Sequence, residues 1–323
     1  MSAILLVLFA ALRFETPDWI EYRDAFLEIV EVGYNYSRFE KSAIFEPLYN
    51  LTAYIVSLFT ANPTIHFFVI AAIAVGLNLS FYSRYSKYFL LTLLFYFVHT
   101  YLFRETMQIR SGVAAAIVLW SLRYVFRQRF IKFSLLVSLA TGFHIGAALF
   151  FIIYPIYRFN WSRKVWLYII AFSIFFAIFL PFGKIIILMP TGGIFQRILV
   201  YSWMMEASQG SVFTNPTILK QLLLVVVALR YWSVLEQKMD YFRLFITPLM
   251  ISLCWLLVWN DFTIVAARIA TFFSVTEVML MPMFFYLVTP KSRPIVGLIL
   301  ILIAFAILGL NIAVDNFAEY NFI

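Results

Sequence analysis

The sequence predicts an all-α integral membrane protein, a polytopic bundle of about eleven transmembrane helices. Of its 323 residues, 64% are hydrophobic and 12% are charged, whereas soluble domains carry about 45–50% apolar and about 25% charged residues. A water-soluble fold cannot bury so much apolar surface, so lipid must surround most of the chain. The apolar runs are continuous rather than alternating, which favours helices over a β-barrel. Disorder is excluded by the same composition, and a disulfide scaffold by the single cysteine, Cys254.

A helix needs about 20 apolar residues to cross the hydrocarbon of a bilayer. We therefore expect a single integral membrane domain over residues 1–323. Its candidate spans are Met1–Leu12, Ile44–Thr60, Thr64–Tyr82, Tyr88–Phe103, Ile109–Phe126, Phe133–Tyr157, Val165–Pro181, Thr217–Leu235, Phe242–Trp259, Phe262–Val288 and Pro294–Ile312. The first span is short for a full crossing. It lacks the basic start and small-residue cleavage pattern of a signal peptide.

Two connecting segments are too long and too polar to be simple turns. The segment 13–43 is acidic, and its apolar residues recur at near-helical spacing, which predicts a helix on the membrane surface in the first extracytoplasmic loop. The segment 183–216 contains Gly192-Gly193 and then an apolar stretch, which predicts a broken amphipathic element capping the bundle. Long loops of this kind are usually functional lids or binding loops.

The net charge of +8 has its commonest explanation in the basic loops of membrane proteins, which stay in the cytoplasm. No basic groove with stacking aromatics indicates a nucleic acid partner. The basic loops are residues 127–132, 158–164, 230–243 and 291–293. One apolar run separates the first two, so both cannot be cytoplasmic if that run crosses once. Either one basic loop is external and functional, or a half-crossing segment exists elsewhere in the bundle, for which Pro181 and Gly192-Gly193 mark the place. The topology stays open.

Polar residues inside apolar surroundings are the candidate functional residues, because a charge near the bilayer centre costs several kcal/mol. The first group is the segment 104–112 between two apolar runs. In one continuous helix, Arg104 and Gln108 share a face, whereas Glu105 and Arg110 point elsewhere. The segment is either a polar hairpin at the membrane surface or a helix start inside the protein, whose positive end and donors would face an anion.

The second candidate is His144, near the middle of a long apolar run and flanked by glycine and alanine. One interpretation is a helix-packing site, where small residues permit close approach and the histidine bonds to a neighbour. The other is a neutral imidazole in a cavity that accepts a proton from a hydroxyl.

The third candidate is Arg268, about two turns after Asn260-Asp261, where it either snorkels to the interface or binds a ligand phosphate. Glu277 lies on the opposite face of the same predicted helix, so it cannot neutralise Arg268 there. The fourth group surrounds the first loop and comprises Arg13, Asp18, Tyr22 and Glu46. The alternative for most of these residues is a solvated interfacial helix with aromatic anchors.

Phosphate-binding loops, dinucleotide fingerprints and metal-binding histidine pairs are absent from the sequence, which has three histidines. We therefore expect no cofactor and no metal.

Several motifs together resemble the EpsG-like branch of the bacterial Wzy polysaccharide polymerases, in an order that covers nearly the whole chain. They are Leu12-Arg13…Asp18…Tyr22, Glu46-Pro47…Tyr49, Arg104…Gln108-Ile109-Arg110…Ala114-Ala115, Gly142-Phe143-His144-Ile145-Gly146-Ala147-Ala148 and Arg268-Ile269-Ala270…Phe273.

This resemblance implies a GT-C-like helical fold and a metal-independent, inverting glycosyltransferase. Such an enzyme joins oligosaccharide repeat units, carried on undecaprenyl diphosphate as donor and acceptor, at the outer face of the bacterial inner membrane. A chain-length regulator and a flippase of the same pathway are the implied protein partners. We expect diphosphate binding and catalysis from Arg104, Arg110 and Arg268, with His144 on the acceptor side. We expect sugar contacts or structural pairing from Arg13, Asp18 and Glu46. We expect substrate binding also from Tyr22, Glu105 and Gln108.

Two other functions are compatible with the sequence. One is another lipid-linked transferase or ligase. A glycosyltransferase that uses a polyprenyl monophosphate sugar, with Asp18 or Glu15 as base, would add single sugars. A transporter or flippase without chemistry would be expected to show related halves and half-helices at the midplane, and the two halves of this chain are not convincingly similar.

Overall fold

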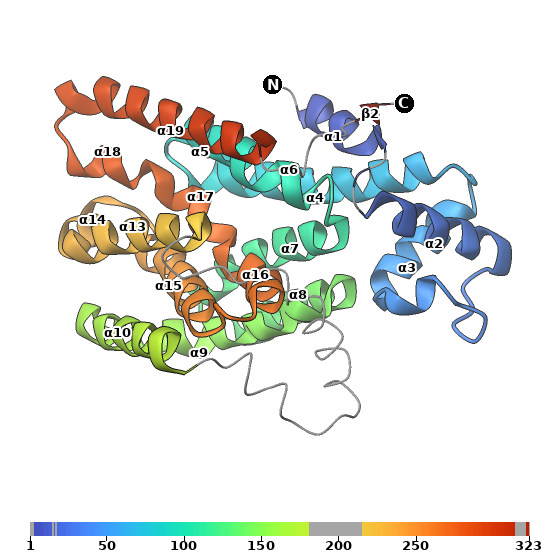
Figure 1. Ribbon diagram of the computed structural model, residues 1–323, viewed down its shortest axis with the longest axis horizontal. Helices are drawn as coiled ribbons and strands as arrows, with labels where there is room; N and C mark the ends of the chain where they lie inside the picture. Colours follow the sequence, from blue (N-terminus) through green and yellow to red (C-terminus); the bar gives the residue numbers. More distant parts are fainter. Residues whose placement is uncertain (1–2, 15, 17, 181–214, 314–320, 323) are drawn as a thin grey trace. The chain divides into compact units, whose positions relative to one another are not determined.

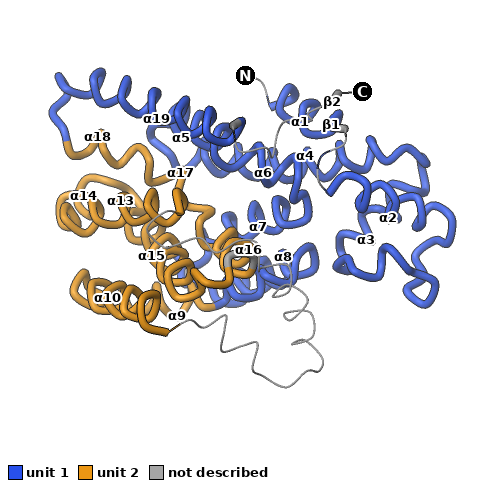
Figure 2. Tube along the Cα trace, in the orientation of Figure 1, with its two compact units in different colours: residues 1–151, 288–323 blue, residues 152–287 orange. Residues whose placement is uncertain are grey.

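The computed structural model is almost entirely helical, as the apolar runs predict (Figure 1). It describes residues 3–14, 16, 18–180, 215–313 and 321–322. These form two compact units, which are described separately (Figure 2). Unit 1 comprises residues 1–151 and 288–323, and unit 2 comprises residues 152–287. Within the described ranges, one pair of two-residue strands interrupts the helices: β1 (Arg13–Phe14) runs antiparallel to β2 (Asn321–Phe322).

Unit 1 is built around a buried helix, α7 (Ile109–Phe126). Its other elements are α1 (Ala3–Ala11), α2 (Trp19–Val32), η1 (Ser42–Ile44), α3 (Pro47–Ser57), α4 (Pro63–Tyr85), α5 (Phe89–Phe95), the π-helical η2 (Tyr96–Tyr101), α6 (Leu102–Arg104), α8 (Phe130–Phe143), η3 (Ile145–Ile152, whose last residue belongs to unit 2), η6 (Pro290–Ser292) and α19 (Arg293–Ala313). Small side chains such as Ala114 and Ala116 are fully buried on α7. They let α4 and α8 pack closely against it.

The long C-terminal helix α19 has the opposite character. Only 11% of its apolar stretch is buried, whereas 72% of the apolar stretch of α7 is buried. Helix α19 is tied to the rest of unit 1 by the Asn311 amide, which donates a 2.7 Å hydrogen bond to the Val98 carbonyl within η2. A π-helical turn leaves carbonyls free of the usual helical partner, and here a side chain supplies the bond. The exposed apolar face of α19 is suited to lipid.

The first long loop contains the predicted helix, α2. Its buried face, Phe26 and Ile29, packs with Phe39, Ala53 and Val56 into a small apolar core. On its other side the Glu28 carboxylate accepts backbone N–H bonds from residues 40, 41 and 42, at 2.7, 3.1 and 2.7 Å. Burial opposes ionisation of Glu28, but these bonds outweigh it and hold the pKa of the carboxyl below its usual range. The loop is therefore folded back on α2. Its place on the membrane surface stays a prediction.

Unit 2 is built around α15 (Phe242–Val258), which packs against α9 (Ile153–Arg158), α10 (Arg163–Phe179), α13 (Pro216–Arg230) and α16 (Thr263–Phe273). The remaining elements are α14 (Trp232–Lys238), η4 (Ser274–Thr276), α17 (Glu277–Leu280), η5 (Met281–Met283) and α18 (Phe284–Leu287). Pro248 inside α15 removes one helical N–H. The carbonyl of Phe245 lies about one turn before Pro248. It accepts a 2.7 Å hydrogen bond from the Thr276 hydroxyl, which ties η4 to α15.

Four helical stretches in the described residues are long and apolar enough to cross a membrane: Pro63–Tyr85, Ile109–Phe126, Val265–Leu287 and Pro290–Ile312. A fifth is counted if α13 and α14, which meet at 83°, form one broken span. The total of eleven spans and the single membrane domain remain predictions. Residues 181–214 lie outside the described residues. The prediction for the second loop, with Pro181 and Gly192-Gly193, falls on them.

Several predicted spans are not regular α-helices throughout, among them the run 262–288, which contains the short 3₁₀ segments η4 and η5. The run 133–157 is divided at His144, whose extended backbone (φ −158°, ψ 120°) ends α8. Glycines flank the break at Gly142 and Gly146, and each weakens a helix by about 1 kcal/mol relative to alanine. The run 88–103 is interrupted by the π-helical segment, and the run 217–235 bends where α13 ends at Arg230. Apolar runs predict where helices form, but they do not show where these helices break.

Candidate functional site

Glu46 connects three separate segments of unit 1. It directly precedes α3, where Pro47 occupies the first helical position and fixes the local backbone. Its Oε2 atom accepts a hydrogen bond from Nη1 of Arg110, on the first turn of α7, and the two charges form an ion pair. Its Oε1 atom accepts the Ile145 backbone N–H at 3.0 Å, just after α8. One carboxylate therefore holds α3, α7 and the break after α8 together.

The guanidinium of Arg110 is held from several sides. It lies 4.4 Å from the centre of the Phe45 ring and 5.8 Å from that of Tyr22, within the range of cation–π attraction. About a fifth of its side chain is exposed (19%), and 15% of Glu46. Among the described residues, its buried Nε atom has no hydrogen-bond partner. Arg110 is therefore a fixed cation whose side chain is partly accessible at the surface of unit 1.

Tyr22 and Asp18 bring α2 to the same place. Tyr22 is buried, and its hydroxyl lies within hydrogen-bonding reach of Arg110. Burial raises the pKa of this hydroxyl above its usual range, although the positive charge of Arg110 works in the other direction. Tyr22 is therefore a neutral donor or acceptor. Asp18 starts α2 and lies close enough to influence Tyr22.

His144 ends α8 next to the amide that binds Glu46. Its Nδ1 atom accepts the Gly146 backbone N–H at 3.1 Å. A neutral imidazole that accepts at Nδ1 carries its hydrogen on Nε2, so in this geometry Nε2 is a hydrogen-bond donor. To act as a base through Nε2, His144 needs the tautomer that carries its hydrogen on Nδ1. In that tautomer Nδ1 cannot accept the hydrogen bond from the Gly146 N–H. That role stays a prediction.

The small residues beside His144 have a packing role. A Cβ atom at Gly142 would lie 2.5 Å from the Leu48 side chain on α3, closer than real Cβ contacts. Close approach of α8 to α3, one of the two interpretations of this motif, is thus confirmed for Gly142. The same close approach brings Glu46 within reach of Ile145.

The segment 104–112 is a helix start preceded by a turn, not the continuous helix that was used to predict its faces. Helix α6 ends at Arg104, and α7 begins after Gln108. A Cβ atom at Gly112 would lie 2.7 Å from both the Arg104 carbonyl oxygen and Glu105 Oε2. Glycine is therefore needed for the turn to pack on α7.

Glu105 anchors this turn from inside. Its carboxylate is 2% exposed and accepts hydrogen bonds from Asn78 at 3.0 Å and Tyr96 at 3.1 Å. Burial raises the pKa of this carboxyl to about 7. We predicted Glu105 as a substrate contact, but its burial leaves it no access to ligand, and its role here is structural. Arg104 is half-buried near Glu105, and Gln108 is exposed at the start of α7.

Arg13 is also buried. Its side chain is 1% exposed, donates to the Ala10 carbonyl at 3.0 Å and lies 4.5 Å above the Phe67 ring. Structural pairing, one of the two roles predicted for Arg13, therefore fits better than sugar contact. It ties α1 and β1 to α4.

Arg268 belongs to unit 2, where it is exposed on α16. Its role in diphosphate binding stays a prediction. The carboxylate of Glu277 is fully buried, pairs with Lys220 at 2.7 Å and accepts from the Gln221 amide at 3.3 Å. Sequence reasoning missed this cluster. Its signal was a lysine and a glutamine inside the apolar run 217–235.

Candidate metal ligands do not gather in the described part of the chain, where no three His, Cys, Asp or Glu side chains form a group able to hold an ion.

The candidate site in unit 1 consists of Tyr22, Glu46, Arg110 and His144, with Asp18 beside it. Arginine, carboxylate, phenol and imidazole are suited to binding anions and moving protons.

Comparison with known families decides the identity. The EpsG family matches residues 1–323, the whole chain. The chain belongs to the EpsG family. EpsG is a Wzy-like polysaccharide polymerase family, which indicates a glycosyltransferase-type polymerase. The family is membrane-associated, consistent with the helices that can span a bilayer. The resemblance seen in the sequence is thus confirmed. Neither the curated proteins nor the solved structures gave a match.

Proposed function

We propose that this EpsG protein is an inverting, metal-independent polymerase that joins oligosaccharide repeat units carried on undecaprenyl diphosphate, at the outer face of the bacterial inner membrane. The observation that carries the proposal is the convergence of Tyr22, Glu46, Arg110 and the His144 segment from four separate parts of unit 1. Tyr22, Glu46 and Arg110, three of the residues predicted for this chemistry, lie together, and His144 directly precedes the amide that binds Glu46.

The proposed reaction exchanges one bond for another at a sugar carbon. A hydroxyl oxygen of the acceptor saccharide attacks the anomeric carbon of the donor, from the side opposite the diphosphate. The bond from that carbon to the diphosphate oxygen breaks, and the undecaprenyl diphosphate leaves with the electron pair. The hydroxyl proton passes to a base. Inversion follows from attack on the far side.

Arg110 has the features that stabilise the leaving diphosphate. Negative charge grows on the diphosphate as the bond breaks, and an oriented guanidinium favours that state over the ground state. Glu46 and Tyr22 orient the guanidinium, so it does not need to reorganise during the reaction. Because Glu46 already offsets part of its charge, we assign a share of the diphosphate to Arg104 and Arg268. A GT-C-like arrangement of the helices belongs to this proposal.

His144 serves the acceptor in this scheme. Its Nε2 atom donates to a sugar oxygen in the geometry described above. It accepts the hydroxyl proton only in the tautomer that carries its hydrogen on Nδ1. Asp18, at the start of α2, and Gln108, exposed at the start of α7, are the remaining candidates for sugar contacts.

The test supplies purified lipid-linked repeat units to the full chain in nanodiscs and separates the products on a gel. A ladder of products supports polymerisation, whereas single additions would assign the chain to a transferase that uses one sugar at a time. No product combined with movement of the lipid across the bilayer would assign it to transport.

Variants connect the reaction to the site. Alanine at Arg104, Arg110 or Arg268 should abolish the ladder while leaving the protein folded, and Arg84→Ala, an exposed arginine at the end of α4, is the matched control. Normal polymer length and amount in two of the three variants would refute the diphosphate assignment. His144→Gln keeps a hydrogen bond but little basicity, so an undiminished ladder would refute the role as base.

A further inference from the structure

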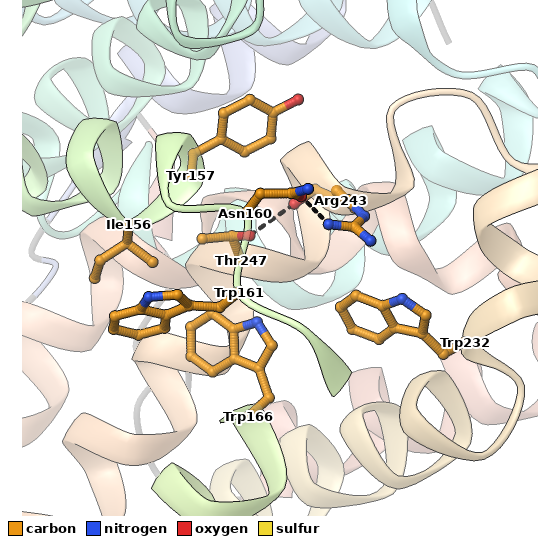
Figure 3. Close-up of a pocket in the computed structure, with 8 residues that line it drawn as sticks. All are labelled: Ile156, Tyr157, Asn160, Trp161, Trp166, Trp232, Arg243 and Thr247. Atoms are coloured by element: carbon orange, nitrogen blue, oxygen red, sulfur yellow. Dashed lines mark hydrogen bonds between the residues drawn. The ribbon is translucent and has the colours of Figure 1, made fainter. Parts of the chain in front are cut away.

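Unit 2 contains a pocket that the proposed polymerase reaction does not use (Figure 3). It is a shallow, partly open hollow with an enclosed volume of about 10 Å³, and it lies where the α9–α10 turn meets α14 and α15. Three indole rings and three polar side chains line it: Trp161, Trp166, Trp232, Asn160, Arg243 and Thr247. The enclosed space holds about one water molecule, so a larger ligand would lie over its opening and not inside it.

Arg243 is held in position at this pocket. Its Nε atom donates to Glu236, and its Nη1 atom donates to the Asn160 side-chain oxygen (Figure 3). The guanidinium also lies 5.7 Å from the centre of the Trp232 ring. In the described part of the chain, its Nη2 atom makes no hydrogen bond, so that nitrogen can donate to a ligand. A guanidinium fixed in this way loses little entropy when it binds an anion.

Asn160 is placed by its backbone. Its φ of 51° is left-handed, a conformation that asparagine tolerates better than most residues. Its side-chain amide lies beside the Arg243 guanidinium, from which its oxygen accepts a hydrogen bond (Figure 3). Its amide nitrogen is a second donor beside the guanidinium.

The two segments that frame the pocket are basic. Residues 158–164 and 230–243 carry six lysines and arginines against two acids, Glu236 and Asp240, which gives a local net charge of 6 − 2 = +4. Glu236 offsets part of the charge of Arg243, but the excess still favours an anion. Both segments are among the loops predicted to be cytoplasmic, where the leaflet carries anionic lipids.

The aromatic lining is typical of a membrane interface. Trp161 and Trp166 meet edge-on with ring centres 5.2 Å apart, and indole rings concentrate where headgroups meet acyl chains. Apolar side chains on the adjoining elements, Phe159 and Tyr168, are 71% and 76% exposed. A ligand with a charged head and apolar tails therefore fits this place better than a soluble anion.

We propose that this pocket binds the phosphate headgroup of an anionic membrane lipid. Arg243 Nη2 and the Asn160 amide donate to the phosphate. The tryptophans flank the glycerol region, and the acyl chains lie over the exposed apolar side chains. The site is independent of the polymerase assignment, because none of its residues belongs to the site in unit 1.

Lipid binding can be measured on the full chain in a neutral detergent by native mass spectrometry. Phosphatidylglycerol and phosphatidylcholine with identical acyl chains are titrated separately. One arginine–phosphate contact at a membrane surface contributes about 1 kcal/mol, so we expect one site with about fivefold preference for phosphatidylglycerol. Arg243→Gln should remove this preference. Arg230→Gln, which removes the same charge from a residue whose guanidinium lies over the Tyr231 ring, should keep it.

Asn160→Gly provides a second variant if Arg243→Gln does not fold. Glycine accepts the left-handed backbone but removes the amide, and we expect a partial loss of the preference. Equal binding of the two lipids, or equal effects of Arg243→Gln and Arg230→Gln, would overturn the proposal. Displacement of phosphatidylglycerol by millimolar inorganic phosphate would also overturn it, because the site would then belong to a free phosphate.

Discussion

Replacing Glu46 with glutamine separates the charge of this residue from its hydrogen bonds. The new side chain would still offer an oxygen to the Ile145 N–H, because an amide accepts as a carboxylate does. It would lack the negative charge that faces Arg110. The substitution therefore tests whether the ion pair holds the guanidinium in position.

The expected magnitude follows from the burial of the pair. Breaking an exposed ion pair changes stability by about 0–1 kcal/mol, and breaking a buried one by about 3–5 kcal/mol. With 15% and 19% of the two side chains exposed, this pair lies between these limits. We expect a loss of about 2 kcal/mol of stability, midway between the two limits. If the pair also holds Arg110 in position for the transition state, the same energy corresponds to about a 30-fold slower reaction.

A double-mutant cycle measures this coupling. Glu46→Gln, Arg110→Gln and the double variant are compared by thermal unfolding in detergent and by the rate of ladder formation. Glu31→Gln, an exposed glutamate on α2, is the control for loss of one negative charge. A coupling energy below about 0.5 kcal/mol, within the error of additive sites, would refute the orienting role. So would a wild-type ladder from Glu46→Gln.

Three further predictions concern the framework of the site. Burial raises the pKa of Glu105 to about 7 from 4.5, so its contribution to stability is complete below pH 4.5 and is lost as the pH rises through 7. Glu105→Gln should remove this pH-dependent loss of stability, which is on the order of 3 kcal/mol. If the stability of both proteins changed by the same amount between pH 5 and 8, that would contradict the prediction. Gly112→Ala should destabilise by about 1–3 kcal/mol, since the new Cβ would lie 2.7 Å from a carbonyl and a carboxylate oxygen; Gly76→Ala, with nothing within 4 Å, should be neutral or stabilising in the same assay. Lys220→Met removes the cation that pairs with the buried Glu277, and we expect about 3–5 kcal/mol of stability to be lost. A thermal-unfolding midpoint equal to wild type would contradict this.

The membrane class, the helix in the first loop and the family could all be predicted from the sequence, because composition and periodicity report directly on lipid exposure and helical faces. Helix breaks were harder to locate. The run around His144 is apolar on both sides, and the helix end depends on Gly142 packing against Leu48, a contact between residues far apart in the chain.

Candidate site residues were selected because they are polar in apolar surroundings. This criterion found Glu46, Arg110 and His144, which the structure brings together. It could not separate exposed from buried residues, so Glu105 was assigned to the substrate although it bonds to Asn78 and Tyr96. Helical periodicity places side chains around one helix, whereas these partners come from other helices.

The carboxylate of Glu46 joins residues 64 and 99 positions further along the chain. Such long-range contacts form late in folding, because two long loops must close before either partner is in reach. A chain whose synthesis has not yet passed Ile145 cannot complete this junction. Arg110 can pair with Glu46 before that point, but the second oxygen of Glu46 gains its partner only once the segment after α8 has been made.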